Sequence, residues 1–420
     1  MMDEDKNDPA NKNGKSFITS IHTFFYDLNQ KTGVGAKATV LIFAVIFILM
    51  FWRIGSYPPY FDELVDFGTY VQVNHVFDHE VGLEKTSWFW KSMHTHGAVE
   101  SPVYGIVTEV GLRLFGLTLF GVRIFPALIA FLSLILIYLA LKKFFSRYLL
   151  LCFIILLSLS TWYLLVARSG SISGFSISLS LIAFSLLLLL FDRKRALGLA
   201  VLAGISAALI PYGYTVIRLW LPILLLVAIL NYKRIEKYNF IAYLSTIFVI
   251  CSIQISNLSE SLTMYFFGRG EGLNTMGKLP DGGYNIPFIL QKLNENLSMT
   301  YNLLLGRNDP GHFWNVNMVK DFSSGDVVLY PKFLVIFMIF GLVFCVVHIF
   351  TKRRPLLFML VALFFIGLLP DLCSGLGTPN LVRSTMLFAP LYFLIAYGVY
   401  YLFSWVYHLT GERLKKLLPF

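Results

Sequence analysis

The sequence predicts an all-α polytopic membrane protein with about ten transmembrane helices. Hydrophobic residues make up 57% of the chain and charged residues only 14%, whereas about a quarter of the residues in a soluble domain are charged. Many apolar runs approach the roughly 20 residues that a helix needs to cross a bilayer. Short basic segments separate these runs. The composition therefore excludes an ordinary soluble domain.

The apolar runs and their charged flanks predict ten spans, at about 38–54, 122–141, 148–167, 172–191, 197–213, 216–231, 239–257, 332–350, 356–370 and 384–406. Residues 103–120 are also fairly apolar, but they contain Glu109 and Arg113. Counting them as a span would move every later basic junction to the other side of the membrane. We therefore predict an interfacial or re-entrant helix there.

The positions of Lys and Arg predict the orientation of the spans. Five junctions hold three basic residues each: Lys142/Lys143/Arg147, Arg193/Lys194/Arg195, Lys233/Arg234/Lys237, Lys352/Arg353/Arg354 and Arg413/Lys415/Lys416. Together with the five Lys of residues 1–37, they place 20 of the 34 basic residues on the N-terminal side. The positive-inside rule then predicts that both termini are cytoplasmic. The same topology suits a bacterial inner membrane or an endoplasmic reticulum protein.

The span pattern divides the chain into four parts. Residues 1–37 are a polar cytoplasmic tail with an interfacial segment, 38–257 a transmembrane module containing outer loop 55–121, 258–331 a second outer loop, and 332–420 the C-terminal helices with a short tail. The two outer loops hold nearly all the outward carboxylates and histidines, so we expect function on that face. Almost no ionisable residue lies at mid-depth of a span, which argues against an ion-coupled transporter.

An acidic pair, Asp62-Glu63, follows Tyr57-Pro-Pro-Tyr-Phe61 at the start of an amphipathic stretch in the first outer loop. Asp62 has two interpretations. It could cap a helix, because a side-chain oxygen satisfies free backbone N–H groups there. It could instead be a base or metal ligand at the mouth of a cavity.

Several separated motifs resemble the C-type (GT-C) membrane glycosyltransferases, which include protein O-mannosyltransferases (family 39) and lipid A aminoarabinose transferases. In chain order, these motifs are Phe61-Asp62-Glu63, Ser101-Pro-Val-Tyr-Gly105, Leu114-Phe-Gly116, Val122-Arg-Ile-Phe-Pro-Ala-Leu128, Ala167-Arg-Ser-Gly170, Tyr212-Gly-Tyr214 with Arg218, Asn296-Leu-Ser-Met299, Gly306-Arg-Asn-Asp-Pro-Gly-His312 with Asn315, and Arg383 ahead of Pro390. The resemblance covers most of the chain, and beyond the first loop it is to bacterial members, which favours a bacterial inner membrane over the endoplasmic reticulum. One departure concerns the donor: where many relatives have Lys-Pro-Pro-Leu, this chain has Glu100-Ser-Pro-Val103.

The resemblance implies an enzyme that transfers a sugar from a polyprenyl-phosphate donor on the outer face, with inversion. Asp62 would be the base and Glu63 would orient it or the acceptor. Arg168, Arg218 and Arg383 would bind the donor phosphate. Tyr212 and Tyr214 would line the substrate pocket, and Asp309, His312 and Asn315 would contact the acceptor. For the arginines and tyrosines, lipid-headgroup contact and an aromatic belt are the simpler interpretations.

No cofactor is certain from the sequence. His94 and His96 could join Asp78, His79 or Glu80 around a divalent metal, although their spacing is not a zinc signature and a solvated loop is the simpler explanation. The four cysteines have no C-x-x-C spacing and suit apolar packing. Anionic lipid as a partner explains the net positive charge of the chain, so the charge does not indicate nucleic-acid binding.

Three other function classes stay open. A non-catalytic binding protein or flippase for lipid-linked sugars would share the arginines but would not need the Asp62-Glu63 pair. An O-antigen-type polymerase suits the long outer loops, and a structural membrane protein does not explain the one-sided carboxylates and arginines. The acceptor is left open among a glycan, a lipid and a protein side chain.

Overall fold

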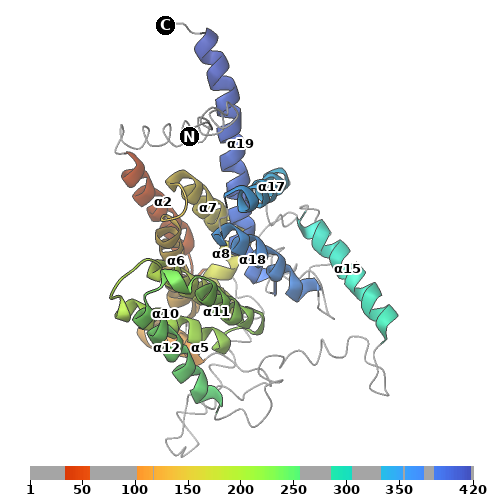
Figure 1. Cartoon of the computed structure of the whole chain (residues 1–420). Coiled ribbons are helices and arrows are strands. Elements are labelled where there is room, and N and C mark those ends of the chain that lie inside the picture. The colour runs from red at the N-terminus through yellow and green to blue at the C-terminus, as the bar shows by residue number, and fades with distance from the viewer. Residues whose placement is uncertain are drawn as a thin grey trace, which may run out of the picture.

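The computed structural model describes residues 34–56, 102–116, 118–255, 285–304, 333–352, 355–372 and 383–417. Within these ranges every regular element is helical and no strand occurs (Figure 1). The α-helices are α2 (Val34–Phe51), α5 (Pro102–Phe115), α6 (Leu119–Leu141), α7 (Arg147–Leu159), α8 (Thr161–Arg168), α9 (Ile172–Leu190), α10 (Leu197–Leu209), α11 (Trp220–Leu230), α12 (Lys237–Ile255), α15 (Ile286–Leu304), α17 (Leu334–Lys352), α18 (Pro355–Leu372) and α19 (Phe388–Leu417). The 3₁₀ helices are η1 (Ile210–Tyr212), η2 (Thr215–Leu219), η3 (Tyr232–Arg234) and η5 (Arg383–Leu387).

Four segments of the described chain are long and apolar enough to cross a membrane: Leu119–Leu141, Ile172–Leu190, Leu334–Thr351 and Thr385–Val406. Each coincides with a predicted span. Shorter apolar helices match the predicted spans at Ala36–Phe51, Leu197–Tyr212, Ile217–Leu230 and Pro355–Pro370, and part of the one at Arg147–Leu159. The predicted span 239–257 corresponds to α12. The helical, multi-pass class is thus confirmed, and the number of ten spans stays a prediction.

The predicted span 148–167 is not one helix, because the chain breaks into α7 and α8 at Ser160. Ser160 is extended, with φ −63° and ψ 125°. Its Oγ accepts a hydrogen bond from the Tyr163 backbone N–H at 3.1 Å and another from Tyr392 Oη at 2.7 Å. The serine therefore satisfies the backbone that the break exposes. Hydropathy records apolar content and does not detect such an interruption.

Part of the predicted outer loop 258–331 is a regular helix, α15. Asn296, which the sequence suggested lies in a loop, is in the middle of this helix and donates from Nδ2 to the Leu372 carbonyl of α18 at 3.0 Å. Polar residues are interspersed with apolar ones along α15 and lower its average hydropathy. A search for apolar runs therefore did not predict this helix.

The ambiguous segment 103–120 contains nearly all of α5 and the first two residues of α6. A helix of 14 residues is about 21 Å long, shorter than the roughly 30 Å hydrocarbon core of a bilayer. It packs closely on α6, since a Cβ at Gly111 would overlap the Gly121 carbonyl oxygen. The length agrees with an interfacial or re-entrant helix.

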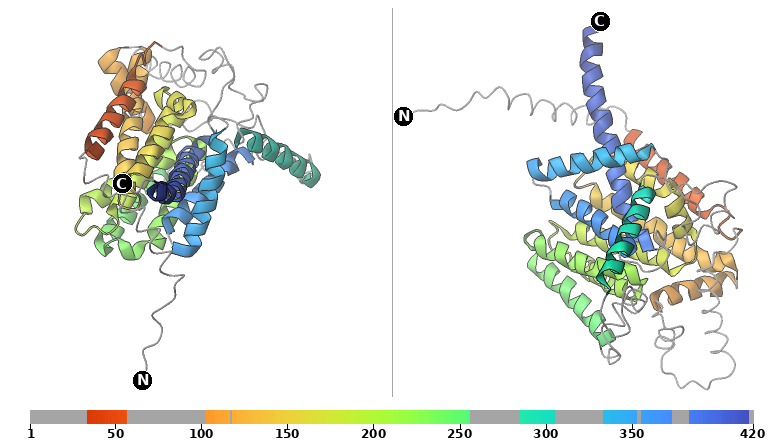
Figure 2. Two further views of the ribbon diagram at one scale, coloured as in Figure 1. Left: turned by 90° about the horizontal axis from the view of Figure 1, so that it is seen from above. Right: turned by 90° about the vertical axis from the view of Figure 1, so that its right-hand side faces the viewer.

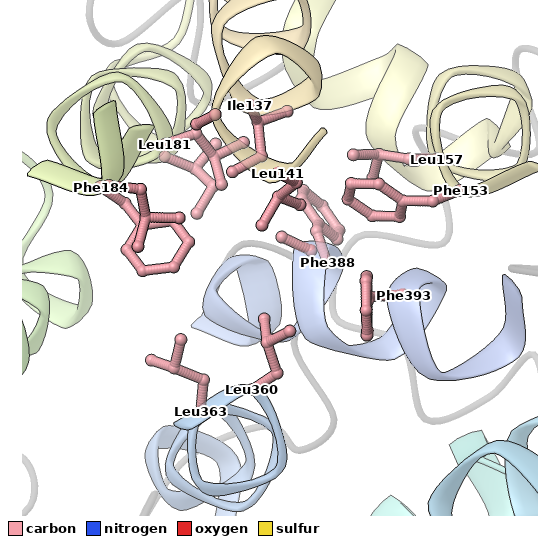
Figure 3. Close-up of a cluster of buried hydrophobic side chains, with 14 of the residues drawn as sticks. Ile137, Leu141, Phe153, Leu157, Leu181, Phe184, Leu360, Leu363, Phe388 and Phe393 are labelled. Atoms are coloured by element: carbon pink, nitrogen blue, oxygen red, sulfur yellow. The ribbon is translucent and has the colours of Figure 1, made fainter. Parts of the chain in front are cut away.

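Helix α9 lies inside the bundle, in contact with α6, α8, α10 and α11. Helix α19 packs along α17 and α7, and its C-terminal part extends beyond the other helices (Figures 1 and 2). Buried apolar side chains from α6, α7, α9, α18 and α19 meet in the core (Figure 3). The labelled members are Ile137, Leu141, Phe153, Leu157, Leu181, Phe184, Leu360, Leu363, Phe388 and Phe393.

Three of the predicted basic junctions meet at one end of the bundle, here called the basic end. Lys143 Nζ donates to the Leu189 carbonyl at 3.2 Å. Arg234 forms an ion pair with Asp192, which lowers the pKa of that carboxyl, and its guanidinium lies 5.2 Å from the centre of the Phe191 ring. These contacts agree with the prediction that the junctions share one side of the membrane.

Candidate functional site

The end of the bundle opposite the basic end begins where α2 stops, and we call it the Ile54 end. After Phe51 the chain turns through residues 52–56, with a hydrogen bond from the Ile54 N–H to the Phe51 carbonyl at 3.3 Å and one from the Ser56 N–H to the Arg53 carbonyl at 2.9 Å. Arg53 has φ +52°, and Ile54 is buried. This turn leads directly to residue 57, from which the acidic motif of the first outer loop follows.

Two arginines from other helices hold this turn. Arg123, near the start of α6, is buried and donates from Nη1 to the Ile54 carbonyl at 2.8 Å. Arg168, the last residue of α8, donates from Nη2 to the Trp52 carbonyl. Hydrogen bonds from a charged donor are stronger than neutral ones. The Ile54 end thus collects guanidinium groups beside the point where the first outer loop starts.

A chain of buried hydroxyl groups follows Arg168 at the junction of α8 and α9. Ser169 Oγ lies 2.8 Å from Ser171 Oγ, which lies 3.0 Å from Ser173 Oγ. Ser171 also caps α9, because its Oγ accepts from the Gly174 N–H at 3.5 Å. The hydroxyls satisfy one another and the helix terminus, and this fixes the backbone that carries Arg168.

Helix α5 is attached to the same junction. Tyr104 Oη donates a hydrogen bond to the Gly170 carbonyl, and its ring lies 5.9 Å from that of Phe175 between ring centres. Both rings are buried. Tyr104 therefore joins the segment of the Ser-Pro-Val-Tyr-Gly motif to that of the Ala-Arg-Ser-Gly motif, 66 residues away.

The Tyr212-Gly213-Tyr214 motif also packs against α9. Ser176 Oγ accepts from the Tyr214 N–H at 2.8 Å and donates to the Ile172 carbonyl at 2.6 Å. A Cβ at Gly213 would lie 2.6 Å from the same Ser176 Oγ, so the close approach requires glycine. Tyr212 is buried and its Oη donates to the Ile250 carbonyl of α12 at 3.3 Å. A role for Tyr212 and Tyr214 in a substrate pocket stays a prediction.

The elements that carry the three predicted phosphate-binding arginines gather around α9. Arg168 ends α8, Arg218 is a buried residue of η2, and Arg383 begins η5. Helices α8, η2 and η5 each contact α9, and η2 contacts η5. The side chain of Arg383 lies outside the described part of the structure, as do Asp62, Glu63, Asp309, His312 and Asn315.

The described part of the chain contains no group of three His, Cys, Asp or Glu side chains that would bind a metal ion. The residues suggested for a divalent ion, Asp78, His79, Glu80, His94 and His96, lie outside that part.

Sequence reasoning assigned no role to Arg123, although the residue stands in one of the family-like motifs. An arginine between Val122 and Ile124 at the start of a long apolar helix is itself a signal, because buried charge inside a membrane bundle is costly and marks a functional or structural contact.

Comparisons with known proteins identify the fold. No protein-family model matches the sequence, and no curated protein sequence matches it. The structure is similar to the oligosaccharyltransferase of Archaeoglobus fulgidus in its apo form, with a TM-score of 0.52 and 12% identity, over 92% of this chain and 52% of that chain. The same archaeal protein, AglB, in complex with an inhibitory peptide and a dolichol-phosphate gives a TM-score of 0.51 and 12% identity, over 93% of this chain and 52% of that chain.

The chain therefore shares its fold with this archaeal oligosaccharyltransferase, which agrees with the fold that the motifs predicted. It spans about half the length of the oligosaccharyltransferase that it matches. ArnT from Cupriavidus metallidurans is less similar, with a TM-score of 0.40 and 13% identity, over 87% of this chain and 78% of that chain.

Proposed function

We propose that the protein is a membrane glycosyltransferase that moves a sugar from a polyprenyl-phosphate donor to an acceptor hydroxyl or amide on the outer face of the membrane. The observation that carries the proposal is the gathering of guanidinium groups at the Ile54 end, where Arg123 and Arg168 hold the start of the first outer loop. The oligosaccharyltransferase fold supports it, and a complex of that archaeal protein contains a dolichol-phosphate.

The proposed reaction is a single displacement with inversion. An acceptor oxygen or nitrogen forms a bond to the anomeric carbon as the bond between that carbon and the phosphate oxygen breaks. The acceptor proton passes to Asp62, and polyprenyl phosphate leaves with the bonding electrons. Charge builds up on the leaving phosphate, so fixed cations near it lower the barrier.

Arg168, Arg218 and Arg383 are the proposed phosphate ligands. A guanidinium carries five N–H donors in a planar fork and stays charged at all physiological pH values. The bond from Arg168 to the Trp52 carbonyl is therefore compatible with a further contact to a phosphate oxygen. Glu63 is proposed to orient Asp62 or the acceptor, while Tyr212, Tyr214, Asp309, His312 and Asn315 are proposed to line the substrate sites.

The test is sugar transfer by purified protein in nanodiscs, supplied with radiolabelled polyprenyl-phosphate sugars and a crude acceptor extract. We expect wild type to transfer label and Asp62→Asn to lose nearly all activity, because general-base catalysis contributes roughly 10²–10⁴-fold. The matched control is Asp192→Asn, a carboxylate at the basic end, which should stay active.

Two results would contradict the proposal. Full activity in Asp62→Asn would show that Asp62 is a helix cap and not the base. Tight binding of the lipid by wild type without transfer to any acceptor would instead favour a binding protein or flippase for lipid-linked sugars.

A further inference from the structure

Helix α15 has its apolar and polar surfaces in an unusual arrangement. The two buried residues of its described side chains are polar: Asn296 is 1% exposed and Thr300 is 2% exposed. Four large apolar side chains are instead 41–59% exposed, namely Leu290, Leu293, Leu297 and Tyr301. They follow one another at intervals of three or four residues, so they form one stripe along the helix. We call this the Leu297 stripe.

The remaining side of α15 is polar and exposed. Gln291, Asn294 and Ser298 lie on it, next to Glu295, which accepts hydrogen bonds from Lys292 at 2.9 Å and Gln291 at 3.1 Å. Successive residues of a helix point about 100° apart, so the polar side at Ser298 adjoins the Leu297 stripe. The helix thus has three sides: one against the protein, one apolar and one polar.

The position of α15 relative to α18 indicates what covers the Leu297 stripe. Asn296 Nδ2 donates to the carbonyl of Leu372, the last residue of α18. Leu369 and Phe365, about one and two turns before Leu372, expose apolar side chains of their own. Exposed apolar side chains of the bundle therefore reach the level of α15, which lies at the periphery of the bundle in Figure 1 and in the left view of Figure 2.

We propose that α15 is an interfacial helix that docks on the bilayer surface. Its Leu297 stripe is buried among the acyl chains of the adjacent leaflet, and its Ser298 side faces the headgroups and water. A helix with adjoining apolar and polar faces binds at this depth because both faces meet a matching medium.

The test is spin-label accessibility in nanodiscs of phosphatidylcholine and phosphatidylglycerol. Nitroxides are attached at Leu297→Cys and Ser298→Cys in a protein whose Cys152, Cys251, Cys345 and Cys373 are replaced by alanine. Both sites are exposed, so neither label disturbs packing. We expect collisions with oxygen, which concentrates in lipid, to be several-fold more frequent at Leu297 than at Ser298. Collisions with a water-soluble nickel chelate should show the reverse order.

Two outcomes would overturn the proposal. A Leu297 label that is as accessible to the nickel chelate as the Ser298 label would place the stripe in water. Exclusion of both reagents together with dipolar broadening would show that a second copy of the chain covers the stripe. Labels at Leu293 and Asn294 repeat the comparison one turn earlier. No step depends on catalysis, so the result is independent of the proposed activity.

Discussion

Arg123 and Ile54 are 69 residues apart in the sequence, yet Arg123 Nη1 lies 2.8 Å from the Ile54 carbonyl oxygen. Arg123 is 3% exposed, so its charge is held inside the bundle, and its guanidinium binds the turn after α2. Arg168 donates a hydrogen bond to the carbonyl of Trp52, two residues before Ile54. The two contacts fix the direction in which the chain enters the first outer loop.

We predict that Arg123→Lys lowers sugar transfer at least tenfold and lowers the melting temperature. Lysine keeps the charge but is not planar and reaches the carbonyl differently. A hydrogen bond to a charged group contributes about 1.5–3 kcal/mol. Transfer assays and thermal unfolding in detergent measure both effects. The control is Arg193→Lys, at an exposed position of the basic end, which should change neither value; equal losses in both variants would refute the role of the Ile54 contact.

The break between α7 and α8 gives a second prediction. Tyr392→Phe removes the hydrogen bond to Ser160 Oγ and should cost about 1 kcal/mol of stability. Ser160→Ala should cost more, because it also removes the cap of α8, which contributes about 0.5–2 kcal/mol. Unfolding of the two single variants and the double variant measures the coupling. Strictly additive losses would mean that the bond between the two side chains contributes nothing.

The crossing of α17 and α19 depends on two glycines. A Cβ at Gly341 would overlap the Leu394 carbonyl oxygen, and a Cβ at Gly398 would overlap the Phe337 carbonyl oxygen. We expect Gly341→Ala to destabilise the protein by about 1–3 kcal/mol, because the helices must separate. Gly198→Ala is the matched control, since no neighbouring atom lies within 4 Å of that Cβ. Thermal unfolding should leave the control unchanged or slightly more stable.

The basic end and the Ile54 end should face opposite sides of the membrane. Lys194 is an exposed residue of the basic end, and Ser56 is exposed at the Ile54 end. With the positive-inside topology, a membrane-impermeant maleimide should label Lys194→Cys only from the cytoplasmic side and Ser56→Cys only from the outer side, in sealed vesicles of each orientation. Labelling with the opposite sidedness would place the Ile54 end in the cytoplasm and remove the outer-face assignment of the site.

The sequence predicted the short motifs but not the contacts between them. The Tyr104, Arg168 and Tyr214 motifs were all recognised from the residues, and the structure joins them around α9. The sequence offered no way to know that Tyr104 binds Gly170 or that Ser176 binds Tyr214, because these partners are 66 and 38 residues apart. The catalytic roles of Asp62 and Glu63 stay predictions.

By itself, the sequence determined the membrane class, most helix positions and the clustering of basic residues at one end. These properties depend on local composition and charge, because the apolar content and flanking charge of each segment determine how it inserts into the bilayer. The tertiary structure decided the break at Ser160, the burial of Arg123 and the faces of α15. Each depends on a distant partner, 232, 69 and 76 residues away respectively, and packing selects such partners only once the helices have assembled.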